Sequence, residues 1–241
     1  ETVKEIVTKY PVDAIHFDDY FYLYTDIGAI DQGTYNQFNP NKLSLDNWRR
    51  QNVNTAIFEV KNYLNSFNRN NARKVAFGVS PFGIWANAST VSGGSLTGGK
   101  QSFVTQYADS RKWVKEGWVD YIIPQIYWPF SHDIAAYAAL TDWWVKTVRG
   151  TNVNLYIGHA VYRLGAEKRW GASELAAQLL PSDAAVADTR FVLDYFRRSV
   201  DGRLLFAGGE KYLPGAPADV AAFVRPHLLR VRLEMHRPFV F

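Results

Sequence analysis

The sequence contains no cysteine among its 241 residues, which excludes disulfide bonds, thiolate metal sites and a cysteine nucleophile. It also lacks an apolar run near the roughly 18 residues that a membrane-spanning helix needs, so we expect no membrane span. The net charge is +4 without a cluster of lysine and arginine, and nucleic-acid binding would need a basic stripe. No predicted strand is followed by GxGxxG or GxxxxGK[ST], so the usual fingerprints of nucleotide binding are missing.

Aromatic residues, in contrast, are abundant. Eight Trp, 14 Tyr and 15 Phe make up 15% of the chain. Large aromatic side chains fill cores, and their rings also stack on the apolar faces of sugars. Most of them are expected in the core, and a few at strand ends are candidates for sugar binding.

The composition changes near residue 178. All eight Trp lie at or before Trp170, and all 14 Asn lie at or before Asn154. Residues 1–178 hold ten Lys and eight Arg, whereas residues 179–241 hold one Lys and eight Arg. We therefore expect two pieces of different origin, 1–178 and 179–241. The alternative is a variable terminal segment whose composition has drifted.

Residues 1–178 alternate between helical and strand-like patterns. Strands are predicted at 12–17, 74–79, 119–127 and 153–162. Helices are predicted at 2–10, from Ser44 or Asp46 to about residue 67, at 102–116, at 133–148, and in a short stretch after Ser173. Apolar strands between helices indicate a parallel sheet, with the strands adjacent in chain order. The fold class is therefore α/β, and four βα units fit half of a (β/α)8 barrel or a doubly wound sheet.

Polar and aromatic residues gather where these predicted strands end. They are Asp18, Asp19, Tyr20, Ser80, Trp85, Gln125, Tyr127, Trp128, His159, Tyr162 and Arg163. Strand ends often meet solvent and are polar for that reason alone. In barrel enzymes, however, the carboxyl ends of the strands form the active-site face, and a mix of carboxylate, amide and aromatic groups on four strands favours such a site.

Four motifs in order are similar to motifs of the glycosyl-hydrolase-like 10 family, the former DUF187 group of bacterial exported proteins. They are VDAIHFDDYFY, KVAFGVSPFGIWAN, YADSRKWVKEGWVDYIIPQIYW and NLYIGHAVYRLG. The resemblance spans residues 1–178 and implies a (β/α)8 barrel, of which this chain would hold about strands four to seven. It also implies a polysaccharide substrate of the bacterial cell wall, of peptidoglycan type or related, and an extracytoplasmic location.

The start and the tail carry separate expectations. The chain shows no signal segment and no initiator Met, which suggests a processed or truncated start. The tail, from LPSDAAVADTRF to PHLLRV, resembles an internal segment of FAD-dependent oxidases of the D-amino-acid-oxidase type. The Gly-rich dinucleotide motif of that family is absent, so we expect neither an oxidase nor a bound cofactor. Residues 203–213 have a second interpretation, as an eighth barrel strand.

Glycoside hydrolysis usually needs two carboxyl groups, about 5–5.5 Å apart in retaining enzymes and roughly 6.5–9.5 Å apart in inverting ones. Asp18 and Asp19 are adjacent, and strand alternation points them to opposite sides. Ile15 and Phe17 resemble residues packed under helices, so His16 and Asp18 should face the barrel axis. We therefore favour Asp18 as the catalytic carboxylate, with Asp19 orienting its neighbours. The alternative is a pair of aspartates that only cap or form salt bridges.

The second catalytic carboxylate is less defined. Glu167 follows the last predicted strand and could reach the site, or a missing strand could supply the partner. His16 and His159 could move protons, although a lone buried histidine is more often a core residue. The substrate-binding candidates are His16, Tyr20, Trp85, Gln125, Tyr127, Trp128, His159 and Arg163. No close ligand spacing such as HxxxH supports a metal site at His16, Asp18 and His159.

Three hypotheses follow from these observations. The chain is a glycan hydrolase, a non-catalytic glycan-binding module, or a misjoined reading frame without a function of its own. Acidic groups within reach of Asp18 would distinguish the first from the second. Half a barrel would expose sheet edges and an apolar face, so self-association through those edges is expected.

Overall fold

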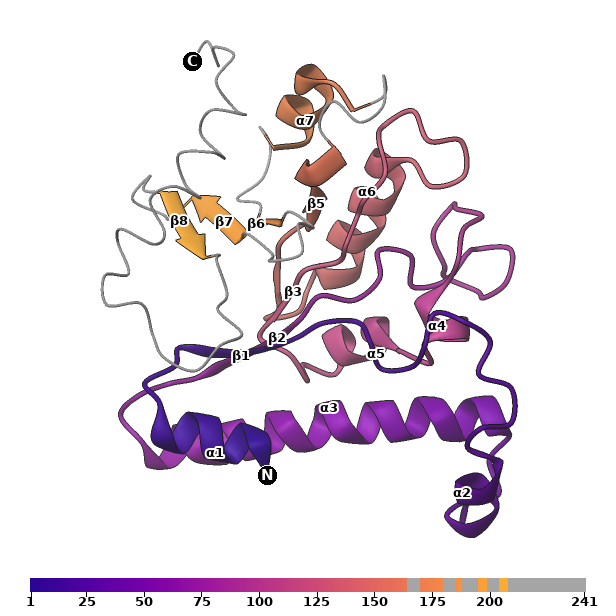
Figure 1. Ribbon diagram of the computed structural model, residues 1–241, viewed down its shortest axis with the longest axis vertical. Coiled ribbons are helices and arrows are strands. Elements are labelled where there is room, and N and C mark those ends of the chain that lie inside the picture. The colour runs from indigo at the N-terminus through magenta and orange to yellow at the C-terminus, as the bar shows by residue number, and fades with distance from the viewer. Residues whose placement is uncertain (164–169, 180–184, 188–194, 199–203, 208–241) are drawn as a thin grey trace, which may run out of the picture. The chain divides into compact units, whose positions relative to one another are not determined.

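The computed structural model describes residues 1–163, 170–179, 185–187, 195–198 and 204–207 (Figure 1). The chain divides into two compact units, Glu1–Ile157 and Gly158–Phe241, and each is described by itself. The composition change near residue 178 therefore falls inside the second unit. Among the described residues, no helix combines the length and the apolar character needed to cross a membrane.

The first unit is built on a parallel sheet of four strands. They are β1 (Ala14–Phe17), β2 (Ala76–Val79), β3 (Tyr121–Ile122) and β4 (Asn154–Leu155). The sheet order is β1-β2-β3-β4, and each adjacent pair is parallel. The predicted α/β class, the parallel pairing and the strand order are thus confirmed, while a barrel stays a prediction.

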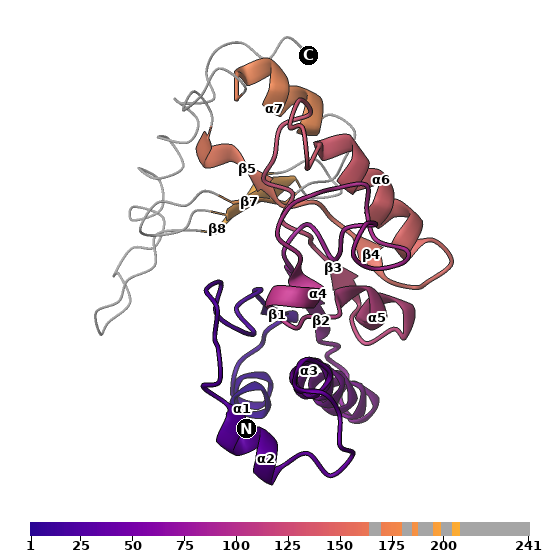
Figure 2. The same ribbon diagram turned by 90° about the vertical axis from the view of Figure 1, so that its right-hand side faces the viewer.

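The helices of the first unit mostly follow the predicted pattern. They are α1 (Thr2–Lys9), α2 (Gln32–Gln37), α3 (Leu45–Asn70), α4 (Ser102–Thr105), α5 (Ser110–Lys115) and α6 (Tyr137–Val148). Both views show α1 lying beside α3 (Figures 1 and 2). The single helix predicted over 102–116 is wrong, because Tyr107 adopts a positive φ of 53° and the Asp109 side chain caps a new helix at the amide of Lys112.

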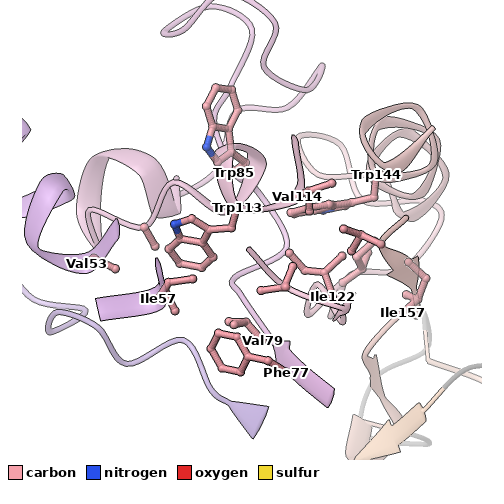
Figure 3. Packing of buried hydrophobic residues seen from close by; sticks show 14 of the residues in the cluster. Val53, Ile57, Phe77, Val79, Trp85, Trp113, Val114, Ile122, Trp144 and Ile157 are labelled. Atoms are coloured by element: carbon pink, nitrogen blue, oxygen red, sulfur yellow. The ribbon is translucent and has the colours of Figure 1, made fainter. Parts of the chain in front are cut away.

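The core lies between the sheet and its helices. Ile15, Phe77, Val79 and Ile122 point from the strands into this core. Helical residues that meet them include Val7, Val53, Ile57, Leu64, Trp113, Val114, Leu140 and Trp144. Figure 3 shows several of these side chains packed together, with the Trp113 indole near Ile57. The side-chain alternation of a strand therefore sends the intervening residues to the opposite face of the sheet.

The second unit has its own sheet. Its strands are β5 (His159–Ala160), β6 (Ala185–Ala187), β7 (Tyr195–Arg198) and β8 (Leu204–Ala207), with a 3-10 turn at Val161–Arg163 and helix α7 (Ala172–Leu179). β5 pairs parallel with β6, whereas β6–β7 and β7–β8 are antiparallel. The strand predicted over 153–162 is thus two strands in two sheets. β8, which lies within residues 203–213, pairs antiparallel with β7, and the interpretation of this stretch as an eighth barrel strand stays a prediction.

Candidate functional site

A row of residues crosses the face of the first sheet that lies opposite the core. His16 is in register with Gly78, and Gly78 is in register with Tyr121. A Cβ atom at Gly78 would lie 2.1 Å from Cε2 of Tyr121, so this ring occupies the space above the glycine. The ring thereby crosses β2 and stacks on His16 at 5.6 Å between centroids. Glycine is therefore required at position 78, because any side chain there would block the Tyr121 ring on β3 from reaching His16 on β1.

His16 is held from both ring nitrogens. Nδ1 lies 3.1 Å from the hydroxyl of Tyr121, and Nε2 lies 2.8 Å from Oγ of Ser80. Partial burial lowers the pKa of His16, and the charge of Asp18 opposes that shift. The neutral imidazole is therefore favoured near pH 7, and it can accept or donate one proton at a fixed position.

Asp18 follows on the same side of β1 and is exposed. Its Oδ1 accepts two hydrogen bonds, from Nε2 of Gln125 at 2.7 Å and from its neighbour's backbone amide, that of Asp19, at 2.9 Å. Gln125 also donates to the carbonyl oxygen of Ser80 at 2.9 Å. Gln125, which follows β3, thus links Asp18 at the end of β1 to Ser80 at the end of β2. Both hydrogen bonds to Asp18 fall on Oδ1.

Asp19 is the buried member of the carboxyl pair, with 2% of its surface exposed. Burial raises its pKa from 3.8 to about 6, a hydrogen bond from Tyr24 opposes the shift, and the charge and hydrogen bond of Asp18 add to it. Tyr24 donates its hydroxyl to Oδ2 of Asp19. Burial and this bond also raise the pKa of Tyr24. The Asp19 carboxyl group is therefore protonated below about pH 6 and ionised above it.

The aromatic candidates occupy different environments. Tyr20 is 75% exposed, whereas Trp85 is only 4% exposed. Trp85 stacks on Trp143 at 5.7 Å, lies under the guanidinium of Arg111, and donates Nε1–H to Asp109. The structure therefore places Trp85 in the core, which corrects its expected position at a sugar-facing surface.

Trp128 and Tyr127 follow Gln125 on the segment after β3, and both are half-buried. The Trp128 ring contacts Phe82 edge to face at 5.5 Å. A Cβ atom at Gly83 would lie 2.9 Å from Cζ3 of Trp128, so a glycine is also needed for this indole to rest on the backbone. The structure thus brings Trp128 near the segment that follows Ser80.

The remaining candidates are not part of the first unit. His159 is fully buried on β5, and burial lowers its pKa to about 4, against a hydrogen bond with Gln178. Arg163 lies over the rings of Tyr162 and Trp170. Glu167 lies outside the described residues. The part of the chain that the structure describes contains no group of three His, Asp or Glu side chains arranged to hold a metal ion.

Sequence reasoning did not assign site roles to Tyr24, Ser80, Phe82 or Tyr121. Ser80 stood at a predicted strand end, so its position was available from the pattern. The role of Tyr121 depends on its register with Gly78. Tyr24 reaches Asp19 from a loop. Neither contact leaves a signal in residue spacing.

Comparisons with known proteins add a family context to this geometry. Residues 1–172 match the family described as Glycosyl hydrolase-like 10. The chain is 41% identical over 191 residues to Glycosyl hydrolase DigH of Escherichia coli (strain K12), covering 76% of this chain and 43% of that protein. It is 42% identical over 166 residues to Glycosyl hydrolase YngK of Bacillus subtilis (strain 168), covering 67% of this chain and 32% of that protein. The chain thus spans less than half of these two relatives.

A shorter match is to a different class of protein, an oxidoreductase. The chain is 44% identical over 54 residues to Probable oxidoreductase OrdL of Rhizobium meliloti (strain 1021), which is 22% of this chain and 13% of that protein. Both resemblances expected from the sequence, to the hydrolase family and to a segment of an oxidoreductase, are therefore confirmed.

Proposed function

Because the chain belongs to the glycosyl hydrolase-like 10 family, we propose that it acts on a bacterial cell-wall polysaccharide, of peptidoglycan type or related, by carboxylate chemistry. The observation that carries this proposal is the Asp18–Asp19 pair at the carboxyl edge of a parallel sheet. The pair combines an exposed carboxyl group, Asp18, with a buried one whose pKa is about 6, Asp19. Such paired, perturbed groups are typical of acid–base sites. The proposed location is extracytoplasmic.

The geometry suggests different roles for the two aspartates. Asp18, anchored through Oδ1, presents Oδ2 to the anomeric carbon or to a water molecule. Asp19 positions Asp18 through its backbone amide and keeps a proton in the pair at mildly acidic pH. The proton donor for the leaving oxygen is assigned to Glu167 or to a part of the relatives that this chain does not span. His16, Gln125 and Trp128 are assigned to binding the sugar.

One observation favours a second candidate function, a glycan-binding module without cleavage. Asp18 and Asp19 are consecutive residues, and the Asp18 carboxylate accepts a hydrogen bond from the backbone amide of Asp19 at 2.9 Å. Catalytic pairs instead stand about 5–9.5 Å apart, so that the sugar or a water molecule fits between them. If no second carboxylate reaches Asp18 across that distance, the site binds glycan and leaves it intact.

Cleavage and binding can be measured separately on the full chain. We would incubate it with purified insoluble cell-wall glycan, measure new reducing ends, and determine bound protein by co-sedimentation. We expect Asp18→Asn to abolish cleavage and Asp19→Asn to weaken it less. Asp142→Asn, on the exposed face of α6, is the matched control. It should release as many reducing ends and bind as much glycan as the unsubstituted chain.

Three results would change the assignment. Equal residual activity in Asp18→Asn and Asp19→Asn would remove both from catalysis. Binding without new reducing ends in the unsubstituted chain would establish the second candidate. Neither binding nor cleavage would reject both functions for this chain.

A further inference from the structure

A serine and a histidine meet on the face of the first sheet that lies opposite the core. His16 is in register with Gly78, and Ser80 follows that glycine by two residues, so alternation puts the two side chains on the same face. Nε2 of His16 lies 2.8 Å from Oγ of Ser80. His16 is exposed and Ser80 is half-buried. A small molecule in solution can therefore reach this pair, unlike a serine and a histidine bonded inside a core.

The other ring nitrogen of His16 is held as well. Nδ1 lies 3.1 Å from the hydroxyl of Tyr121, whose ring stacks on the imidazole at an interplanar angle of 11°. Gly78 admits the Tyr121 ring because it has no side chain. In the tautomer with its proton on Nδ1, His16 donates to Tyr121 and accepts the hydroxyl proton of Ser80 at Nε2. Tyr121 thereby fixes the imidazole in the orientation that a base acting on Ser80 needs.

The surroundings of His16 also suit a base. Partial burial lowers the pKa of His16, and the charge of Asp18 opposes that shift. The neutral ring, which is the form that takes up a proton, is therefore favoured near pH 7. Once His16 is protonated, the negative charge of Asp18 stabilises the imidazolium. A hydroxyl group, a base in contact with it and a third group that orients the base are the arrangement that activates a serine as a nucleophile.

We propose that Ser80 and His16 form a nucleophile–base pair that hydrolyses esters of short carboxylic acids, such as acetates, an activity separate from glycosidic cleavage. Oγ of Ser80 attacks the ester carbonyl carbon while its proton moves to Nε2 of His16. The bond to the alcohol oxygen then breaks, and His16 gives the proton to that oxygen, which leaves the acyl group on Ser80. A water molecule next gives a proton to His16 and attacks the acyl carbon. The carboxylic acid departs as Oγ of Ser80 takes the proton back, so that ester and water become alcohol and acid.

Hydrolysis of para-nitrophenyl acetate and naphthyl acetate by the full chain tests the inference. These esters have no glycosidic bond, so the result does not depend on the proposed glycan cleavage. Ser80→Ala should abolish the hydrolysis, and His16→Gln should lower kcat/KM about 100-fold or more. Tyr121→Phe keeps the stacked ring but loses the hydroxyl, so it should lower kcat with little change in KM. Ser89→Ala, at an exposed serine that follows β2, is the matched control and should hydrolyse both esters like the unsubstituted chain.

Covalent labelling of the unsubstituted chain gives a second measurement, which holds even if a variant fails to fold. A fluorophosphonate probe should bond to Oγ of Ser80 with loss of fluoride, and peptide mass spectrometry locates the label. Protein quenched in acid during turnover should carry an acetyl group on the same residue. The proposal is rejected if hydrolysis does not exceed the buffer blank, if it persists in Ser80→Ala, or if the label lies only on other residues. Ester hydrolysis in a chain that never cleaves glycan would instead reject only the proposed glycosidic activity.

Discussion

Asp19 couples the candidate site to the stability of the fold. Its pKa is raised to about 6 because burial disfavours the charged carboxylate. Below about pH 3.8 the group is protonated in both the folded and the unfolded chain. As the pH rises to about 6, the unfolded chain releases this proton first, so the free energy of unfolding falls. Above that window the folded chain carries the full cost of a buried charge.

We therefore expect the free energy of unfolding of Asp19→Asn, relative to that of the unsubstituted chain, to rise as pH increases from about 4 to 6. The gain should approach roughly 1–3 kcal/mol, since one pKa unit corresponds to about 1.4 kcal/mol. Urea unfolding of Asp19→Asn and of the unsubstituted chain between pH 4 and 8 measures this difference in stability, with Asp142→Asn as the control. A stability difference that does not change with pH would contradict the raised pKa.

Gly78 is the second residue with a specific expected cost. A methyl group there would overlap the Tyr121 ring at 2.1 Å, and overpacking of this kind typically costs about 1–3 kcal/mol. We expect Gly78→Ala to lower the urea midpoint and to lose the Tyr121–His16 contact. Gly33→Ala, in α2 with nothing within 4 Å, is the control and should not destabilise. If Tyr121→Ala does not relieve the defect of Gly78→Ala, the clash is not its cause.

The sequence allowed the orientation of β1 to be predicted, but not the surroundings of single side chains. Alternation correctly separated Ile15 and Phe17, which pack on the core side, from His16 and Asp18. The burial of Asp19 and Trp85 depends on Tyr24, Trp143 and Arg111. These partners lie in loops and helices whose placement is decided by tertiary packing. Residue type at a strand end therefore does not distinguish a surface tryptophan from a core one.

At the scale of elements, one arginine fastens the long segment between β1 and α3. Arg49 is 3% exposed and binds Asp31 through Nε at 2.9 Å and Nη2 at 2.5 Å. It also donates to the Tyr107 hydroxyl at 2.8 Å and to the Gly28 carbonyl oxygen at 2.7 Å. Hydrogen bonds from Arg49 lower the pKa of Asp31. The planar fork of arginine therefore joins this segment to α3 and to the break between α4 and α5.

Lysine cannot reproduce that set of contacts, because it offers a point charge instead of a planar fork. We expect Arg49→Lys to lose about 2 kcal/mol or more of unfolding free energy, since breaking buried ion pairs costs roughly 3–5 kcal/mol and lysine restores only part. Limited proteolysis should begin within residues 20–44. Arg69→Lys, exposed in the last turn of α3, should leave both measurements unchanged. An unchanged cleavage pattern in Arg49→Lys would show that the segment is held elsewhere.

Element positions were predicted best where hydrophobic periodicity is long and uninterrupted. Helix α3 and the parallel order of the first four strands follow from such patterns. The pattern could not show that residues 153–162 divide between two sheets, because both halves are equally apolar. It also could not show the break at Tyr107, whose positive φ is uncommon for a residue with a side chain.

At the scale of the whole molecule, the first sheet ends at β1. β1 is an edge strand, and no described residue pairs with its free side. Asp13 and Phe17 accept hydrogen bonds from the β2 side, so the backbone groups of Ala14 and His16 point to the free edge. Unpaired edges promote pairing with another chain. We therefore expect the protein to self-associate through β1.

Proline at position 14 separates this edge pairing from the fold. Ala14→Pro removes an outward N–H while the ladder to β2 keeps its own bonds, and proline is tolerated on edge strands for that reason. Sedimentation velocity over a range of concentrations should show the unsubstituted chain and Ala14→Val associating, and Ala14→Pro associating less. A similar urea midpoint for the two variants would show that the fold is intact. Equal association of both variants would exclude β1 as the interface, since only the N–H at position 14 differs in hydrogen-bonding capacity.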